Sequence, residues 1–284
     1  MNKICIVSLF YDIGRGEWQN IFNRKFDQYL ECFMPYIDLF KQDIVDKTNN
    51  FNLENRYEMI LYIDSRYYDK TKAAIPADLP IQLVSINERF LNDNIPTWSK
   101  LTREAEIMNS DQYKTRFAHR LQYPENSNPK YTLINIAKLD FIAHTIVNNL
   151  SSINANYFCW GDFGYFKLPQ WIPKRLIDPS KLDTTRINYV TVNPLDNNDR
   201  DVIYTMNNAP ERIDGGFIFG HKTLMLKYQK LIHNIHDWFQ VNDLADDDQH
   251  HALRCYFARP DMFNLINTGP NSWHIFFTFA EKKE

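Results

Sequence analysis

The chain has 284 residues, of which 44% are hydrophobic and 15% are aromatic, and its formal net charge is −3. This charge balance creates no field that would attract nucleic acid or an anionic membrane, so we expect no nucleic-acid partner. No apolar segment is long enough to cross a membrane, although peripheral contact with a membrane surface is compatible with the sequence.

Four cysteines, Cys5, Cys32, Cys159 and Cys255, form no Cys-x-x-Cys pair, and Cys5 and Cys159 lie in apolar runs. This pattern is typical of reduced, buried thiols and not of a disulfide framework. The first residues, MNKICIVSLFYD, have too short an apolar run for a signal peptide and predict a first strand. We therefore expect a cytoplasmic protein that is at most peripheral to the inner face of a membrane.

The first part of the chain alternates between strand and helix patterns. Strands are predicted at residues 3–10, 57–63 and 81–86, and a helix at residues 18–34 that ends near Pro35. This spacing is typical of a mostly parallel sheet flanked by helices, which is an α/β fold.

The rest of the chain predicts a long helix at residues 131–150, where apolar residues recur at helical spacing, and then a strand that begins at Tyr157. Residues 168–185 are rich in proline and basic residues and predict a loop that packs on the sheet. Further helices are predicted at residues 99–121, 223–239 and 246–257, and further strands at residues 186–192, 212–219 and 273–279.

The most informative motif is YFCWGDFGYF at residues 157–166, an apolar run that ends on Asp162 between two glycines. In open α/β sheets, ligands bind where strands end. A carboxylate there is a suitable ligand for Mg²⁺ or Mn²⁺, which take oxygen ligands together with substrate phosphates. The alternative is an aspartate that caps a local turn.

Three later features could add to such a site. Gly215 and Gly216 follow Asp214 in an apolar strand pattern, which indicates either a bulge or a close backbone approach to a ligand. A late histidine, His274, could complete a metal site, although a lone histidine near a strand is more often structural.

The third feature is the acidic run Asp246-Asp247-Asp248-Gln249, which opens a predicted helix. One of these carboxylates could act as a general base or orient a sugar. The alternative is a solvated helix cap, because carboxylates are favourable at helix N-termini.

Two basic residues are candidates for binding phosphate. Arg15 lies in a glycine-flanked loop directly after the first strand, where its guanidinium could meet a phosphate. Lys138 lies at the edge of an apolar helical face, from which it either reaches solvent or points at a buried anion.

The order of these features resembles the shared core of GT-A fold glycosyltransferases. More narrowly, the segments SLFYDIGRGEW, INIAKLDFI and CWGDFGYF resemble the bacterial HtrL/YibB (WlaTC-like) family of glycosyltransferase-like proteins. The resemblance extends over most of the chain, from Lys3 to the strand predicted at residues 273–279.

This resemblance implies one GT-A-like domain at residues 1–284, with a mostly parallel central sheet and a small antiparallel C-terminal part. Residues 1–165 would form the nucleotide-sugar-binding half and residues 166–284 the acceptor-side half. The implied reaction moves a sugar from a nucleoside-diphosphate sugar to a glycan, glycolipid or protein acceptor, with Mn²⁺ or Mg²⁺ at the donor diphosphate.

The resemblance also implies roles for single residues. Asp162 and His274 would bind the metal, Asp247 or Asp248 would act as base, and Arg15, Lys138, Gly215, Gly216 and Gln249 would bind the donor. Because Asp248 and Gln249 also match an Asp-Gln pair of retaining members, the resemblance leaves the stereochemical outcome open.

One residue departs from the motif, since Trp160 stands where a complete Asp-x-Asp motif has its first aspartate. Two alternatives accompany the glycosyltransferase hypothesis, and the missing aspartate favours the second of them. One is a metal-dependent phosphoester hydrolase that uses Asp162 and the acidic run at 246–248. The other is a non-catalytic domain that binds a nucleotide sugar or a glycan.

Overall fold

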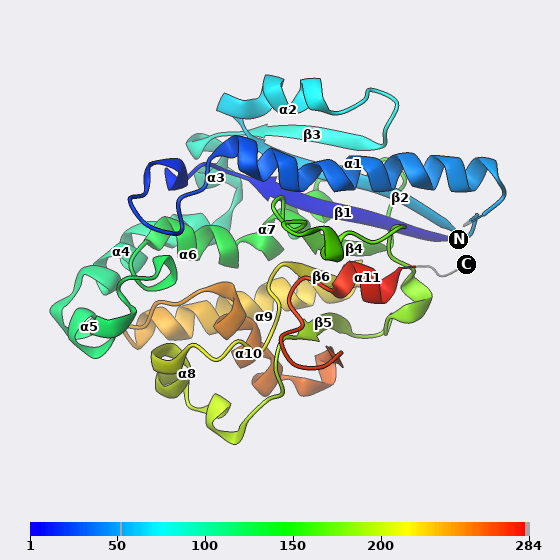
Figure 1. Ribbon diagram of the computed structural model, residues 1–284. Helices are drawn as coiled ribbons and strands as arrows, with labels where there is room; N and C mark the ends of the chain where they lie inside the picture. The colour runs from blue at the N-terminus through cyan, green and yellow to red at the C-terminus, as the bar shows by residue number, and fades with distance from the viewer. Residues whose placement is uncertain (52, 282–284) are drawn as a thin grey trace.

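The computed structural model describes residues 1–51 and 53–281. In this part of the chain, one sheet has the strand order β3-β2-β1-β4-β6-β5-β7, and helices lie on both of its faces (Figure 1). The strands are β1 Asn2–Phe10, β2 Asn55–Asp64, β3 Ile81–Ile86, β4 Tyr157–Gly161, β5 Ile187–Thr191, β6 Phe217–His221 and β7 Phe263–Asn267. The helices are α1 Phe26–Thr48, α2 Tyr68–Ala74, α3 Glu88–Asn94, α4 Leu101–Asn109, α5 Asp111–Arg116, α6 Pro129–Ile136, α7 Lys138–Val147, α8 Val202–Asn208, α9 Lys222–Val241, α10 Asp248–Ala258 and α11 Phe276–Ala280.

The sheet is mostly parallel, as predicted. Only β6 among these strands runs against its neighbours, and it pairs antiparallel with both β4 and β5. The predicted α/β class is therefore confirmed, but the antiparallel part is a strand within the main sheet and not a separate layer. Because β6 is reversed, its first residue, Phe217, pairs with Gly161 at the end of β4. This pairing brings the residues before β6 to the edge of the sheet where β4 ends.

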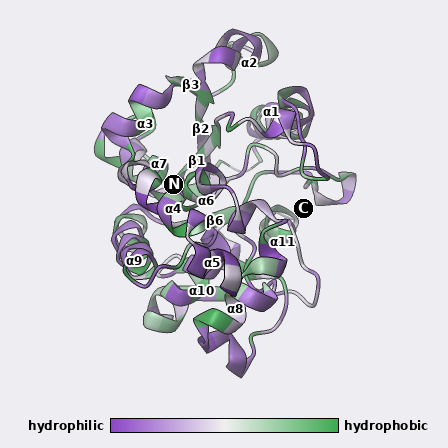
Figure 2. Ribbon diagram, turned by 90° about the vertical axis from the view of Figure 1, so that its left-hand side faces the viewer, coloured by the Kyte–Doolittle hydropathy of each residue, from purple (hydrophilic) through white to green (hydrophobic). Residues whose placement is uncertain are grey.

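Two apolar cores cover the two faces of the sheet. Successive side chains of a strand point to opposite faces, and β1 accordingly sends Cys5 and Val7 into one core and Ile4 and Ile6 into the other. The first core includes residues of α6, α7, α9 and α10, and the second includes residues of α1 and α11. Figure 2 shows apolar residues of β2 inside the molecule, with hydrophilic residues on outer elements such as α5.

Several helices differ from their predicted bounds. Helix α1 begins at Phe26 and continues through Pro35 to Thr48. Proline interrupts a helix because it lacks an N–H group, but Phe33 and Tyr36 on either side of it are fully buried, and this packing outweighs the lost hydrogen bond. The helix predicted at 99–121 is divided into α4, α5 and short 3-10 turns, and the one at 131–150 is divided into α6 and α7 at Ala137.

The C-terminal predictions contain two errors. Residues 273–279 do not form a strand, because the chain makes a turn at His274 and then forms α11. Gly215 and Gly216 also lie outside any strand, in a turn directly before β6. The last strand of the sheet is instead β7, which was not predicted and which pairs parallel with β5. No helix in the described residues is both long enough and apolar enough to span a membrane.

Candidate functional site

A pocket of about 200 Å³ opens beside the carboxyl ends of β1 and β4. From β1 the sheet continues to β2 on one side and to β4 on the other, so the strand order reverses between β1 and β4. Ligands of open α/β sheets bind at such a switch point. The pocket is lined by the loop after β1, the start of α1, α6, the start of α7, the loop after β4, and His274.

Lys138 is the centre of the polar network at this pocket. It is the first residue of α7 and is 5% exposed. Its Nζ donates to Asp248 Oδ2 at 2.8 Å and to the Gly215 carbonyl at 2.9 Å, and it lies 3.3 Å from Asp162 Oδ1. Desolvation alone would lower the pKa of Lys138, but the Asp162 and Asp248 carboxylates outweigh it and raise the pKa. Lys138 is therefore a buried, permanently charged ammonium group.

Asp162 follows β4 and lines the pocket, as its position in the sequence predicts. Its Oδ1 accepts a hydrogen bond from the indole Nε1 of Trp160 at 2.6 Å. Its backbone N–H donates to the Gly216 carbonyl at 3.0 Å, which fixes the loop after β4 to the turn before β6. The tryptophan in place of a first motif aspartate thus orients the remaining carboxylate.

The glycine turn packs closely against two side chains of the network. A Cβ at Gly215 would lie 2.6 Å from Asp248 Oδ2, and a Cβ at Gly216 would lie 3.1 Å from His274 Nδ1. The two glycines do not form a bulge within a strand, since they lie in the turn before β6. Their close neighbours are side chains of the protein itself, and the predicted approach to a ligand stays a prediction.

Asp214, which the sequence reasoning did not select, holds this turn in place. Its buried carboxylate accepts hydrogen bonds from the backbone N–H groups of Gly216 at 2.9 Å and His274 at 2.8 Å. Burial raises the pKa of Asp214. His274 has a positive φ of 55°, which is uncommon for a residue other than glycine. Asp214 thus fixes both the glycine turn and the backbone of His274.

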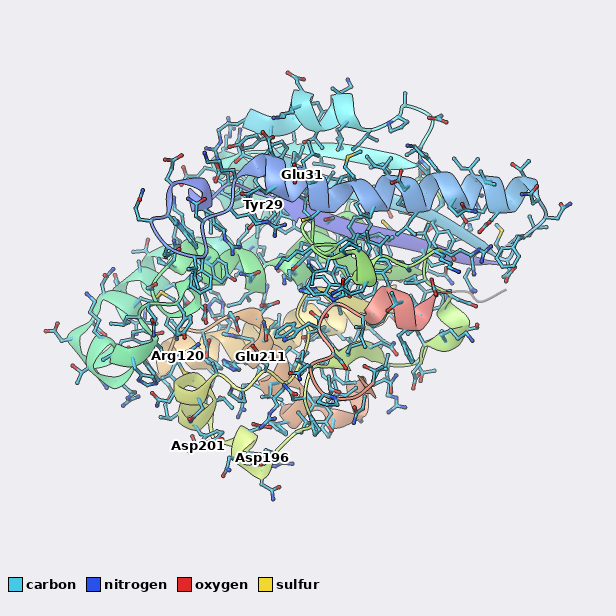
Figure 3. The ribbon with its side chains drawn as sticks, in the orientation of Figure 1. Tyr29, Glu31, Arg120, Asp196, Asp201 and Glu211 are labelled. Atoms are coloured by element: carbon cyan, nitrogen blue, oxygen red, sulfur yellow. The ribbon has the colours of Figure 1, made fainter. Side chains whose placement is uncertain are left out.

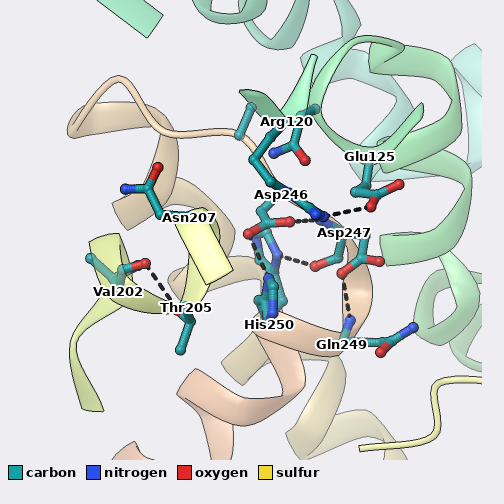
Figure 4. A network of polar contacts seen from close by, with 12 residues as sticks. Arg120, Glu125, Val202, Thr205, Asn207, Asp246, Asp247, Gln249 and His250 are labelled. Carbon is teal, nitrogen blue, oxygen red and sulfur yellow. Dashed lines mark hydrogen bonds and ion pairs between the residues drawn. The ribbon is translucent and has the colours of Figure 1, made fainter. Parts of the chain in front are cut away.

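The acidic run 246–249 divides between two environments. Asp248 is the first residue of α10 and contacts Lys138. Asp247 is the N-cap of the same helix and accepts from the Gln249 N–H at 3.2 Å (Figure 4). Asp247, Asp248 and Gln249 all lie outside the pocket lining, and Asp248 is linked to the pocket through Lys138. Burial raises the pKa of Asp247 to about 8, with further contributions from Asp246 and Asp248. Burial also raises the pKa of Asp248, against the opposing charge of Lys138.

Behind this helix start lies a second polar group. Asp246, Asp247 and His250 each place a ligand atom within 4.8 Å of the others, so the group could hold a cation. His250 Nδ1 lies 2.6 Å from Asp246 Oδ2 (Figure 4). Burial lowers the pKa of His250, but Asp246 outweighs it, and the pKa rises to about 9. The protonated histidine thus already neutralises Asp246.

Arg15 lines the pocket from the loop after β1, as expected. Its guanidinium donates to the Tyr29 hydroxyl and the Phe22 carbonyl, both at 2.7 Å, and lies over the ring of Tyr131. Tyr29 is in the first turns of α1 (Figure 3). Two further cations, Arg24 and Lys167, also line the pocket. Neither residue lies in a sequence motif, so no local pattern predicts its role.

The residues at the pocket do not fit a resident divalent ion well. Asp162 and His274 both line the pocket, but Asp162 Oδ1 already meets the Trp160 indole and the Lys138 ammonium group. His274 Nδ1 is buried, lies 3.9 Å from Asp214 Oδ1 and has no hydrogen-bond partner among the residues that the structure describes. The pocket is lined by four cationic side chains and by two carboxylates, Asp12 and Asp162, and Asp12 pairs with Arg66. The net positive charge of the pocket lining would therefore repel a divalent cation.

Comparisons with known proteins identify the family of the chain. The chain is 24% identical over 284 residues to Protein HtrL of Escherichia coli (strain K12), which covers 97% of this chain and 92% of that protein. Among solved structures it is similar to the core-mannan synthase A (CmsA/Ktr4) of Aspergillus fumigatus in its Mn/GDP form. That similarity has a TM-score of 0.49 and 11% identity, over 93% of this chain and 72% of the other. A family model described as a bacterial protein of unknown function (HtrL_YibB) matches residues 2–281. The chain belongs to the HtrL/YibB family.

Proposed function

We propose that the protein is a glycosyltransferase that moves a sugar from a nucleoside-diphosphate donor to a glycan, glycolipid or protein acceptor. The observation that carries this proposal is the Lys138 network at the switch-point pocket. It joins Asp162, the Gly215 carbonyl and Asp248, which come from three distant parts of the chain. Cations and aromatic rings line the same pocket, and this combination suits a diphosphate joined to a sugar or a base.

The proposed roles follow from the contacts of each group. Lys138 and Arg15 would stabilise the negative charge that develops on the leaving diphosphate, which is the kind of electrostatic contribution that dominates many enzymes. Asp248 would act as the base or orient a sugar hydroxyl, because its raised pKa makes the carboxylate a stronger proton acceptor. Asp247 is the weaker candidate, since it caps α10 and makes no contact with Lys138, whereas Asp248 accepts a hydrogen bond from Lys138 Nζ.

The remaining expected residues would position the donor. Gly215 and Gly216 would let a sugar approach the backbone, and Gln249 would reach it from the first turn of α10. If Mn²⁺ or Mg²⁺ bound beside the donor diphosphate, Asp162 and His274 would be its ligands. The poor fit of these residues to an ion leads us to assign the chemistry to the side chains of the chain itself.

The proposal can be tested by measuring first the binding of donors and then turnover with the best donor. A panel of nucleoside-diphosphate sugars is first ranked by thermal shift, because a ligand at 100 times its Kd adds about 2.7 kcal/mol of stability. The best donor is then incubated with cell-surface glycan and lipid fractions, and release of the nucleoside diphosphate is measured. We expect Asp248→Asn to bind the donor and to lose at least about 100-fold in turnover, the usual effect of removing an acid–base group.

The matched control is Asp261→Asn, since Asp261 pairs with Arg259 on the surface, away from the pocket. Unchanged turnover in Asp248→Asn would contradict the role of that residue. Release of nucleotide that no acceptor accelerates would favour a hydrolase. Donor binding without any turnover in the wild type would favour a non-catalytic binding domain.

A further inference from the structure

Three cations meet at the pocket from two separate loops. Arg15 and Arg24 lie in the segment between β1 and α1, and Lys167 follows the loop after β4. A Cβ at Gly164 would lie 2.9 Å from a guanidinium nitrogen of Arg24, so this arginine packs directly on the loop that contains Asp162. Desolvation lowers the pKa of Lys167, and the charges of Arg24 and Arg15 lower it further, against the opposing charge of Asp162. The three positive charges are therefore close enough to repel one another.

The partners of the two arginines are neutral. Arg15 donates to the Phe22 carbonyl and the Tyr29 hydroxyl, and Arg24 Nη2 lies 2.6 Å from Cys32 Sγ and lies over the ring of Tyr29. Within residues 1–51 and 53–281, no carboxylate forms an ion pair with Arg15, Arg24 or Lys167. Clustered cations without a carboxylate cost free energy unless an anion joins them, and arginine guanidinium groups match phosphate oxygens in geometry.

The ammonium group of Lys138 already compensates the charge of Asp162, the carboxylate that a metal ion would use. Nζ of this lysine lies 3.3 Å from Asp162 Oδ1 and 2.8 Å from Asp248 Oδ2. Asp12, the other carboxylate of the pocket, pairs with Arg66. The charge that a diphosphate brings is thus balanced by cations that belong to the chain.

We infer that Arg15, Arg24 and Lys167 form a diphosphate subsite that binds the donor without a divalent metal ion. The inference rests on the proposed function, because it identifies which part of the donor these residues contact. It adds Arg24 and Lys167 to the binding residues, and it makes Mn²⁺ and Mg²⁺ dispensable for binding. Because donor binding then needs no metal ion, it needs no carboxylate besides Asp162 to hold one. The first position of the Asp-x-Asp motif can therefore be a tryptophan, Trp160.

The test is a titration of the whole protein with UDP, GDP, ADP and inorganic pyrophosphate, each in EDTA and in Mn²⁺. We expect the best nucleoside diphosphate to bind in EDTA with a Kd within about threefold of that in Mn²⁺. Loss of binding in EDTA with recovery in Mn²⁺ would overturn the inference while leaving the glycosyltransferase proposal intact. Absence of nucleotide binding in both conditions would instead remove the proposed function.

Two variants test the residues themselves. Arg24→Gln and Lys167→Gln keep side chains of similar length and remove the charge, and each is expected to weaken nucleotide binding about tenfold in EDTA. Arg259→Gln is the matched control, because Arg259 is an exposed arginine that pairs with Asp261. If both pocket variants retain wild-type Kd values, the subsite assignment is wrong. The wild-type titration in EDTA needs no variant, so it decides the metal question even if one variant fails to fold.

Inorganic pyrophosphate distinguishes a subsite for a nucleotide donor from a subsite that binds any diphosphate. If the nucleoside diphosphate binds at least tenfold more tightly than pyrophosphate, the subsite serves a nucleotide donor, as inferred. If pyrophosphate binds as tightly and the two pocket variants weaken both ligands equally, the subsite recognises a diphosphate alone. The second result would overturn its assignment to a nucleotide donor.

Discussion

A single ammonium group joins residues that are far apart in the sequence. Lys138 contacts Asp248 across 110 residues and the Gly215 carbonyl across 77, and it is almost fully buried. Removing one partner of a buried ion pair leaves the other charge uncompensated, which typically costs about 3–5 kcal/mol. We expect Lys138→Met to lower the free energy of unfolding by about this amount and to abolish sugar transfer. Urea unfolding followed by circular dichroism measures the first effect.

A double variant separates folding from function at this residue. Lys138→Met combined with Asp248→Asn removes both charges of the closest pair, so much of the lost stability should return. Turnover should not return, because the groups that act on the donor are still missing. A double variant as unstable as the single one would show that Lys138 stabilises the protein chiefly through Asp162 or through packing.

The sequence identified most residues of this network but not the contacts between them. Asp162, the glycine pair, Asp248 and His274 each carry a local signal, such as a strand exit, a helix start or a turn. Arg24 and Lys167 carry none, and Asp214, which precedes the glycine pair, gains its second role only where His274 meets it. Asp247 and Asp248 look equivalent in the sequence, and only the first turn of α10 shows that Asp248 faces Lys138 while Asp247 caps the helix.

At the scale of elements, the N-terminus of α10 couples stability to pH. The folded-state pKa of Asp247 is about 8, above its ordinary value of 3.8, so the folded protein binds a proton that the unfolded chain releases. This contribution is fully present below about pH 4 and is lost as pH rises toward 8. The pKa of His250 is raised from 6.5 to about 9. His250 therefore also contributes stability that is lost as the pH rises from 6.5 to about 9.

Asp247→Asn should remove most of this pH dependence and keep the cap, because asparagine caps helices as well as aspartate does. The stability of the wild type relative to the variant should fall from pH 5 to pH 8, by at most about 1.4 kcal/mol per pH unit. Urea unfolding at four pH values gives the difference. Parallel stability curves for the two proteins would contradict the assignment of a protonated Asp247.

The first and last residues of helices and strands were harder to predict from the sequence than the presence of these elements. The strands β1, β2 and β3 were expected within two residues of their observed bounds, because buried parallel strands are continuous apolar runs. Helix α1 was misplaced, since Pro35 is a strong local stop signal that buried aromatic packing overrides. The strand expected at 273–279 was wrong because aromatic residues that favour strands also fill a short buried helix, α11.

At the scale of the whole molecule, the two proposed halves share one sheet. Residues 1–165 supply β1 to β4 and residues 166–284 supply β5 to β7, and the halves join where β4 pairs with β6. The network of Lys138 crosses the same boundary. We therefore expect a single cooperative unfolding transition, in which circular dichroism and tryptophan fluorescence give the same midpoint in urea. Two separated midpoints would show that the halves fold as independent domains.

The hydrogen bond between the Trp160 indole and Asp162 also gives the pocket a natural optical probe. The indole is 2% exposed, donates to a carboxylate, and has the Lys138 ammonium group 6.0 Å from the centre of its ring. Its emission therefore depends on the local electric field, which changes whenever an anion enters beside Asp162. In a variant that keeps Trp160 and replaces the other five tryptophans, ligands, inhibitors and acceptors could thus be ranked by fluorescence without an added label.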